Sequence, residues 1–258
     1  MKNSLFIFFL IFLSTGLAIN TKAQRPADSL TDIGMRDPES FRIKMRTTEI
    51  VATSASIAYG AIKLGNHGLT DVDIAARQEF ALEHPHPKFR VDDYLQFAPG
   101  GVTLIMGAAG IEGRNRFGDQ AGVYLLSNLI LNITTQSIKR ITKVPRPDGS
   151  SNAFPSGHTA EAFASAEFMS LEYGRRSIAY PIGAYASAVA VGYLRMYNNK
   201  HWLSDVVTGA GVGFLSTRLA YLIYPAVKQL FWKKGTKNAM ALPSYNHGMV
   251  GASLIGNF

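Results

Sequence analysis

Three short polar clusters decide how this chain is organised: KRITKVPRP at 139–147, PSGH at 155–158 and RMYNNKHWLSD at 195–205. Each cluster stands at the edge of a run of apolar residues. Apolar runs of this length form a packed scaffold, and polar clusters between them lie where the scaffold meets solvent. The sequence therefore predicts one functional site assembled from three separate segments.

Three of the cations in these clusters are the candidates for binding an anion: Lys139, Arg146 and Arg195. Arginine presents a planar fork of N–H donors that matches phosphate oxygens, and lysine adds a compact positive charge. Any one of these cations alone is typical of a helix end or a membrane flank. Three of them in one site favour a multiply charged anion.

The second cluster is typical of a helix start. Pro155 ends the preceding segment, Ser156 is a good N-cap, and the following residues favour helix. The N-terminus of a helix offers free N–H groups and a partial positive charge to an anion, and Gly157 allows close approach to the backbone. Taken alone, the same residues also fit a plain helix cap with His158 facing solvent.

The third cluster pairs His201 with Asp205, four residues apart on one helix face. A carboxylate on one ring nitrogen sets the tautomer and raises the basicity of the other. Such a histidine can attack phosphorus, and a second one, His158, can protonate the leaving oxygen. Taken alone, the pair also fits a surface contact beside Trp202. The clusters together make a phosphoryl-transfer set that needs no metal, because the cations neutralise the developing charge.

The combined pattern resembles the three-part signature of the type 2 phosphatidic acid phosphatase and vanadium haloperoxidase superfamily, and its membrane-type lipid phosphatases in particular. The resemblance covers the segment from Lys139 to Asp205. One departure is Leu194, because the family usually has serine before the arginine of the third motif. That departure puts a supporting hydrogen bond in doubt and leaves the chemistry in place.

The resemblance implies a role for each motif residue. His201 would be the nucleophile, Asp205 would orient it, and His158 would be the general acid. The groups that hold the phosphate oxygens would be Lys139, Arg146, Ser156, the backbone N–H of Gly157, and Arg195. The resemblance implies no metal and no cofactor, and vanadate would be bound only if the protein were a haloperoxidase.

The apolar runs predict an all-α fold, a bundle of about six helices embedded in a membrane, with the active site at one end of the bundle. The expected helices are 49–64, 94–111, 121–141, 156–173, 177–197 and 201–224, the second of them broken at Pro99. Three glycines at 209, 211 and 213 predict close packing of the last helix against its neighbours.

The chain divides into four parts. Residues 1–24 read as a signal peptide, or alternatively as an uncleaved anchor, and 25–47 as an exposed polar lead-in. Residues 48–232 form the predicted phosphatase-like helical domain, and 233–258 are a weakly alternating tail of unknown role. Within the domain, the segment 65–90 contains an HPHP run at 84–87 whose histidines could suggest a metal site. The interleaved prolines argue against such a site, so we expect this segment to be a solvated loop.

The amino-acid composition limits the classes of chemistry and of binding partner that the protein can have. The formal net charge is +8, only 17% of residues are charged, and there is no cysteine. Thiolate catalysis, disulfides and cysteine metal sites are thereby excluded. Because no basic arm with interleaved aromatic residues is present, we expect no nucleic acid partner, and the positive charge favours a lipid phosphate substrate and a membrane.

Charge placement also bears on localisation. Arg114, Arg116, Arg175, Arg176 and the lysines after 227 would lie at the end of the bundle away from the clusters. The positive-inside rule then puts the active site on the periplasmic side of a multi-pass protein of the bacterial envelope. If the signal peptide is cleaved, the basic residues before the first helix lie outside the cytoplasm, whereas the positive-inside rule puts them inside if that helix spans the membrane. A periplasmic or secreted domain is therefore the alternative.

We therefore expect a hydrolase of phosphate monoesters or pyrophosphates that acts through a phosphohistidine. Candidate substrates are phosphatidate, phosphatidylglycerol phosphate, polyprenyl pyrophosphate and lipid A phosphate. The alternatives are a vanadium-dependent haloperoxidase, a soluble secreted acid phosphatase, and an envelope scaffold without activity. The oligomeric state does not follow from the sequence.

Overall fold

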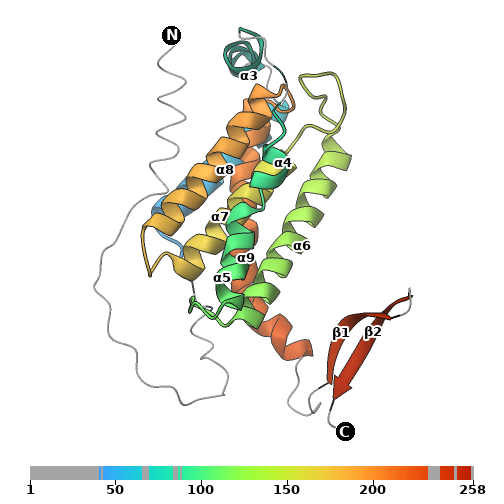
Figure 1. The fold of residues 1–258 in the computed structure, drawn as a ribbon. Helices are drawn as coiled ribbons and strands as arrows, with labels where there is room; N and C mark the ends of the chain where they lie inside the picture. The colour runs from blue at the N-terminus through green and yellow to red at the C-terminus, as the bar shows by residue number, and fades with distance from the viewer. Residues whose placement is uncertain are drawn as a thin grey trace.

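The computed structural model describes residues 41, 43–65, 70–83, 87 and 89–231, together with two strands at 239–246 and 249–256. The predicted signal peptide, most of the lead-in and the residues 84–86 of the HPHP run lie outside the described residues. What is described is a bundle of helices followed by a β-hairpin (Figure 1).

Within the described part of the chain, six helices of eleven residues or more form the bundle. They are α2 (Thr47–Gly65), α5 (Ala98–Ala108), α6 (Phe117–Thr142), α7 (Gly157–Tyr173), α8 (Ala179–Tyr197) and α9 (Leu203–Phe231). They correspond one to one with the six expected helices, so the all-α prediction is confirmed. Helix α9 runs past its predicted end at 224 because it continues through Pro225.

Helix α7 is the centre of the bundle. It packs against α5, α6, α8 and α9 (Figure 1). Its sequence is rich in alanine, and Ala160, Ala162, Ala164 and Ala166 are fully buried. Small side chains let neighbouring helices approach closely, so α7 can be surrounded on all sides.

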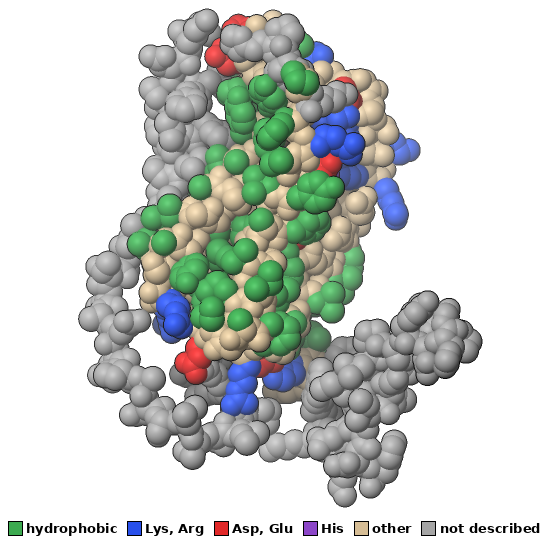
Figure 2. Space-filling view, in the orientation of Figure 1, with side chains coloured by type: hydrophobic (Ala, Val, Ile, Leu, Met, Phe, Trp, Pro, Cys, Tyr) green, Lys and Arg blue, Asp and Glu red, His purple; other side chains and the backbone are tan. Residues whose placement is uncertain are grey.

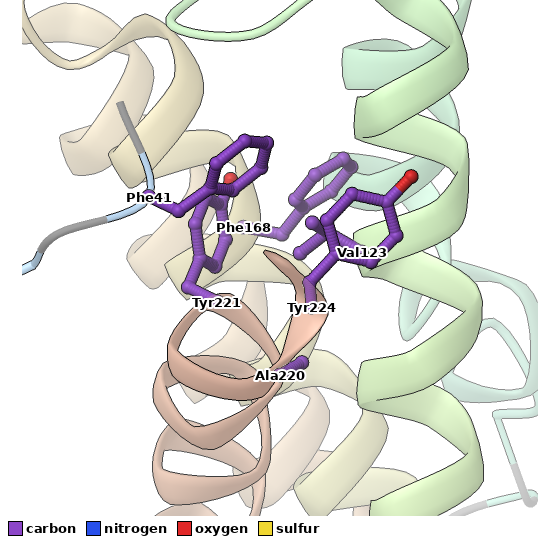
Figure 3. Close-up of a cluster of buried hydrophobic side chains, with 6 residues drawn as sticks. All are labelled: Phe41, Val123, Phe168, Ala220, Tyr221 and Tyr224. Carbon is purple, nitrogen blue, oxygen red and sulfur yellow. The ribbon is translucent and has the colours of Figure 1, made fainter. Parts of the chain in front are cut away.

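The main aromatic core lies toward the end of the bundle away from the polar clusters. It is formed by Phe41, Val123, Phe168, Ala220, Tyr221 and Tyr224 (Figure 3). Burying a large apolar side chain stabilises a fold by roughly 1.5–3 kcal/mol, so this cluster ties α6, α7 and α9 together. Phe41 belongs to the lead-in that we expected to be exposed, yet it is 6% exposed. The expectation was wrong there because the aromatic ring fills the gap beside Tyr224.

The glycines of α9 set its distance from α7. A Cβ atom on Gly213 would lie 2.0 Å from the carbonyl oxygen of Ala160, and one on Gly209 would lie 2.6 Å from that of Ser156. No larger residue fits against a backbone at these distances. The predicted close packing is confirmed, and it holds the start of α9 beside the start of α7.

The segment 65–90 differs from the expected loop. It contains α3 (Thr70–Arg77), which continues as the π-helix η3 (Gln78–Leu82). Acidic residues in the first turn and Arg77 in the last turn favour this helix through its dipole, and Ala76 is 1% exposed. The prediction was wrong because the eight residues of α3 are too few to show a sustained helical period.

Two further elements complete the chain. The short helix α4 (Asp92–Leu95) precedes α5, where Pro99 occupies the first turn. The break expected at Pro99 therefore lies between two helices. In the tail, β1 (Ala239–Asn246) pairs with β2 (Met249–Gly256) in an antiparallel hairpin, in keeping with its weak alternation.

One helix in the described part of the chain, Leu203–Leu230 of α9, is long and apolar enough to cross a membrane, and 61% of its most apolar window is buried in the bundle. Figure 2 shows hydrophobic side chains along the middle of one face, with most Lys and Arg toward its ends. Exposed apolar side chains on α6 and α9 include Leu125, Ile133 and Leu222. This surface is compatible with lipid contact, and the multi-pass topology stays a prediction.

Candidate active site

The three clusters meet at one end of the bundle, where the α6–α7 loop, the start of α7 and the α8–α9 turn lie together (Figure 1). Lys139 is in the last turn of α6 and Arg195 in the last turn of α8. The charges of Lys139, Arg146, Arg195 and His158 all act on the imidazole of His201. The structure therefore brings the predicted residues around one point.

His201 and Asp205 form the innermost pair. The Nδ1 atom of His201 lies 3.4 Å from Oδ2 of Asp205, and their side chains are 2% and 0% exposed. The same carboxylate oxygen accepts the backbone N–H of Trp202 at 2.9 Å. Asp205 is the third residue of α9, so it reaches back to the residue before the helix as a capping-box acid does. With Nδ1 directed at Asp205, Nε2 is left for substrate.

The surroundings of His201 keep its ring neutral. Burial lowers the pKa of His201 well below its usual value, and the positive charges of Arg195, Lys139 and Arg146 lower it further. A neutral imidazole has a lone pair, which is what a nucleophile needs. The cations that would attract phosphate thus also hold His201 in the reactive form.

The α6–α7 loop is held by its own hydrogen bonds. The Nζ of Lys139 donates to the carbonyl oxygens of Asn152 and Ala153 at 2.8 and 3.2 Å. The backbone N–H of Arg146 donates to Ser150 at 2.7 Å, across a turn in which Gly149 has φ of +86°. Glycine suits that left-handed conformation, so the turn presents Arg146 without strain.

Two guanidinium groups have capacity for an anion. Within the described part of the chain, the Nε atoms of Arg146 and Arg195 are buried without a hydrogen-bond partner. Burial and the nearby charge of Arg195 lower the pKa of Arg146. Buried donors without acceptors and mutually repelling cations both favour binding of a multiply charged anion at this point.

Ser156 has a structural task. Its Oγ accepts the backbone N–H of Thr159 at 3.4 Å and shares a 2.8 Å hydrogen bond with the Thr159 hydroxyl. Its own N–H donates to the carbonyl oxygen of Asp205 at 3.0 Å. Ser156 is therefore the expected N-cap of α7 and joins α7 to α9. Its contact with phosphate, and that of the Gly157 N–H, stay predictions.

Two carboxylates that the sequence analysis missed complete the site, and both come from α4. Asp92 accepts a hydrogen bond from Arg195 at 2.6 Å, and Asp93 lies 3.0 Å from Nε2 of His158. Their side chains are 1% and 32% exposed. The sequence did contain a signal for these residues, namely two adjacent acids just before an apolar helix. Because the motifs supply far more cations than carboxylates, such acids could have been predicted as partners of the cations.

A third missed carboxylate, Asp73, comes from α3. It accepts the backbone N–H and the hydroxyl of Ser204 at 2.9 and 2.7 Å, and it pairs with Lys63 at 3.2 Å. These contacts anchor the first turn of α9, which carries Asp205. The cations of Lys63 and Arg77 also lie over the Trp202 ring, at 5.7 and 5.8 Å from its centre. No local sequence pattern indicated the contact between Asp73 and Ser204, because α3 itself was not predicted.

One group in the described part of the chain has the composition of a metal site. Ligand atoms of Asp92, Asp93 and His158 lie within 4.8 Å of one another. The guanidinium of Arg195 is already 2.6 Å from Asp92 and 4.0 Å from Asp93. A fixed positive charge there opposes a second cation, so we assign this group to the anion site.

Comparison with known proteins agrees with the motifs. Residues 120–229 match the model of the PAP2 superfamily, and this segment contains every catalytic and phosphate-binding residue that we predicted. The resemblance to the type 2 phosphatidic acid phosphatases is thereby confirmed. A relative described as lipid A 1-phosphatase, from Porphyromonas gingivalis, is 39% identical over 141 residues. That match covers 52% of this chain and 31% of the length of the relative.

Two crystal structures are similar to this chain in fold. One is the transmembrane PAP2-type phosphatidylglycerolphosphate phosphatase from Bacillus subtilis, with a TM-score of 0.53 and 20% identity over 70% of this chain and 98% of that one. The other is LpxE from Aquifex aeolicus, with a TM-score of 0.46 and 21% identity over 57% of this chain and 93% of that one.

Proposed function

We propose that this chain, whose residues 120–229 match the PAP2 superfamily, is a lipid phosphatase that acts through a phosphohistidine, with the 1-phosphate of lipid A as the favoured substrate. The observation that carries the proposal is a buried His201–Asp205 pair on which the charges of His158 and of two arginines with unpartnered Nε donors act. The relative from Porphyromonas gingivalis supports lipid A among the candidate lipids.

The first step forms a phosphoenzyme. The phosphate binds between Lys139, Arg146 and Arg195, which neutralise its charge. Nε2 of His201 attacks phosphorus while the Nδ1–H remains directed at Asp205. The bond from phosphorus to the ester oxygen breaks, and that oxygen takes a proton from His158.

The second step releases phosphate. A water molecule gives a proton to His158 as its oxygen bonds to phosphorus. The bond between phosphorus and Nε2 of His201 breaks, and the electron pair returns to the imidazole. Inorganic phosphate leaves, and both histidines regain their starting protonation. No metal takes part in this scheme, because the three cations carry the charge of the transferring group.

The apolar surface of the bundle supports the proposal that the substrate is a lipid. The exposed apolar side chains of α6 and α9 would contact acyl chains, and the site at the end of the bundle would meet the phosphate near the headgroup level. Arg114 and Arg175 lie at the opposite end of the bundle, beyond α5 and α7. The positive-inside rule supports a site that faces the periplasm.

The deciding experiment measures phosphate release by the purified protein and its His201→Ala variant, with and without a chelator. The panel holds lipid A 1-phosphate, phosphatidate, phosphatidylglycerol phosphate, a polyprenyl pyrophosphate and a water-soluble aryl phosphate. We expect chelator-resistant release, fastest from lipid A and absent in the variant. Release that a chelator stops would contradict the metal-free scheme, and preference for the soluble ester would contradict a lipid substrate.

A matched control is Glu112→Gln, an exposed carboxylate between α5 and α6 at the far end of the bundle. It should keep the wild-type rate. If the wild-type protein releases no phosphate from any substrate, vanadate-dependent halide oxidation becomes the next assay, because a haloperoxidase uses a similar anion site.

A further inference from the structure

The contact between Asp93 and His158 joins two distant parts of the chain. Asp93 lies on α4 and His158 at the start of α7, and Oδ1 of Asp93 is 3.0 Å from Nε2 of His158. The two side chains are 32% and 31% exposed, so the pair stands at the mouth of the site. The motif signature of the sequence contains no partner for this histidine.

We propose that Asp93 is the positioning residue of His158: it orients the imidazole and favours the protonated form that gives a proton to the leaving oxygen. This inference rests on the proposed phosphatase function. A carboxylate on one ring nitrogen leaves the other nitrogen as the donor toward substrate. Asp93 itself stays ionised through both steps, and only His158 gains and loses a proton.

The charges around His158 explain why it needs such a partner. The charged groups that act on it are Asp92 and Asp93 of α4 and Arg195 of α8, and the His201 ring lies near it. Burial and the charge of Arg195 lower the pKa of His158, whereas the two carboxylates raise it. Without a carboxylate, His158 would lose its proton at a lower pH and fail as an acid.

The two acids of α4 contact different partners. Asp92 is 2.6 Å from Arg195, so its charge is largely compensated by that guanidinium. Asp93 is 4.0 Å from the same group and points one oxygen at His158. Its other oxygen accepts a hydrogen bond from Arg90 at 3.2 Å, but Arg90 is 83% exposed, so solvent screens that pair. Asp93 is therefore the carboxylate available to the imidazole.

The first test compares leaving groups in Asp93→Asn. A poor leaving group, such as the alkoxide of a lipid, needs its proton, whereas an aryl oxide does not. We expect kcat/KM, which covers only the steps up to departure of the leaving group, to fall roughly 10–100-fold on the lipid phosphate and by less than about threefold on the aryl phosphate. Asp93→Glu should restore part of the lipid activity, and Glu112→Gln should behave as wild type. Equal losses on both substrates would overturn the proposal, because a merely structural role of α4 would slow both alike.

The second test needs no turnover. Titration of ¹⁵N-histidine-labelled full-length protein by NMR, with the His158 signal assigned from His158→Gln, reports the protonation of the ring directly. The expected result is a lower pKa of His158 in Asp93→Asn than in wild type, and no change in Glu112→Gln. An unchanged pKa would refute the role of Asp93 even if the protein proved to be a phosphatase. A lowered pKa in a protein that releases no phosphate would uphold the pairing and place the error in the proposed function.

Discussion

The two histidine–aspartate pairs of the site differ in burial. His201 and Asp205 are 2% and 0% exposed, whereas His158 and Asp93 are 31% and 32% exposed. The inner pair comes from one stretch of five residues, 201–205, that leads into α9. The outer pair joins α4 to α7 across 65 positions.

The difference matches two chemical tasks. A nucleophile must keep its lone pair, and burial beside three cations excludes water and holds His201 neutral. A general acid must exchange protons with water in every cycle, and a half-exposed ring can do so. Burial thus distinguishes the proposed nucleophile from the proposed acid in two otherwise similar pairs, as different environments separate paired carboxylates in other hydrolases.

The largest effect is expected for His201→Ala. Because the covalent intermediate cannot form, kcat should fall by roughly 10⁴-fold or more, equally on lipid and aryl phosphates. Steady-state phosphate release on both substrates measures it. Retention of activity on the aryl phosphate would mean that water attacks phosphorus directly and that the inner pair is not a nucleophile.

His158→Gln should have a smaller and selective effect. Loss of a general acid costs about 10²–10⁴-fold, and the loss should appear on the lipid phosphate far more than on the aryl phosphate. The measurement is the ratio of kcat/KM values on the two substrates, because kcat/KM covers departure of the leaving group and not the later step in which His158 acts as a base. A uniform loss would indicate that the outer histidine binds phosphate and does not protonate the leaving group.

The pH dependence of the reaction rate should reflect the different protonation states that the two histidines require. His158 must be protonated and His201 neutral in the free enzyme. The pKa of His158 is lowered from its ordinary value of about 6.5, and that of His201 lies well below the same value. The kcat/KM should therefore be highest on the acidic side of neutrality and fall as the pH rises through the pKa of His158. A pH–rate profile on the aryl and lipid substrates tests this, and a maximum in alkaline solution would contradict it.

The smallest effect is expected for Lys200→Ala. Lys200 directly precedes His201, and it pairs with Asp148 at 2.7 Å with side chains 30% and 20% exposed. Partly exposed ion pairs contribute about 0–1 kcal/mol, so kcat should stay within about threefold of wild type. Thermal unfolding and phosphate release together check it. A large loss would show that proximity to the inner pair matters more than burial.

Much of the site was predictable because the motifs are local. His201 and Asp205 are four residues apart, and Ser156 and His158 stand at a recognisable helix start. A spacing of a few residues keeps two side chains within reach of each other, and here His201 lies two residues before α9 and Asp205 is the third residue of that helix. The six long helices were predictable for the same reason, because each shows a sustained apolar run.

The contacts that complete the site were not predictable in this way. Asp93 reaches His158, Asp92 reaches Arg195, and Asp73 reaches Ser204 from helices that are too short to show a sustained helical period. Each of these contacts spans 65 or more positions, and no spacing rule relates such residues. Phe41 in the core is a further case, because its neighbours lie far along the chain.

The amino-acid sequence by itself determined the six long helices, the three motifs and the chemistry that they favour, because those features depend on residue type and short spacing. Only the tertiary structure decided which carboxylate serves which cation or histidine, and which histidine is sealed from water. Those properties depend on how α3, α4 and the start of α9 pack against α7 and α8. Burial and pairing arise from packing, and in this site they distinguish the proposed nucleophile from the proposed acid.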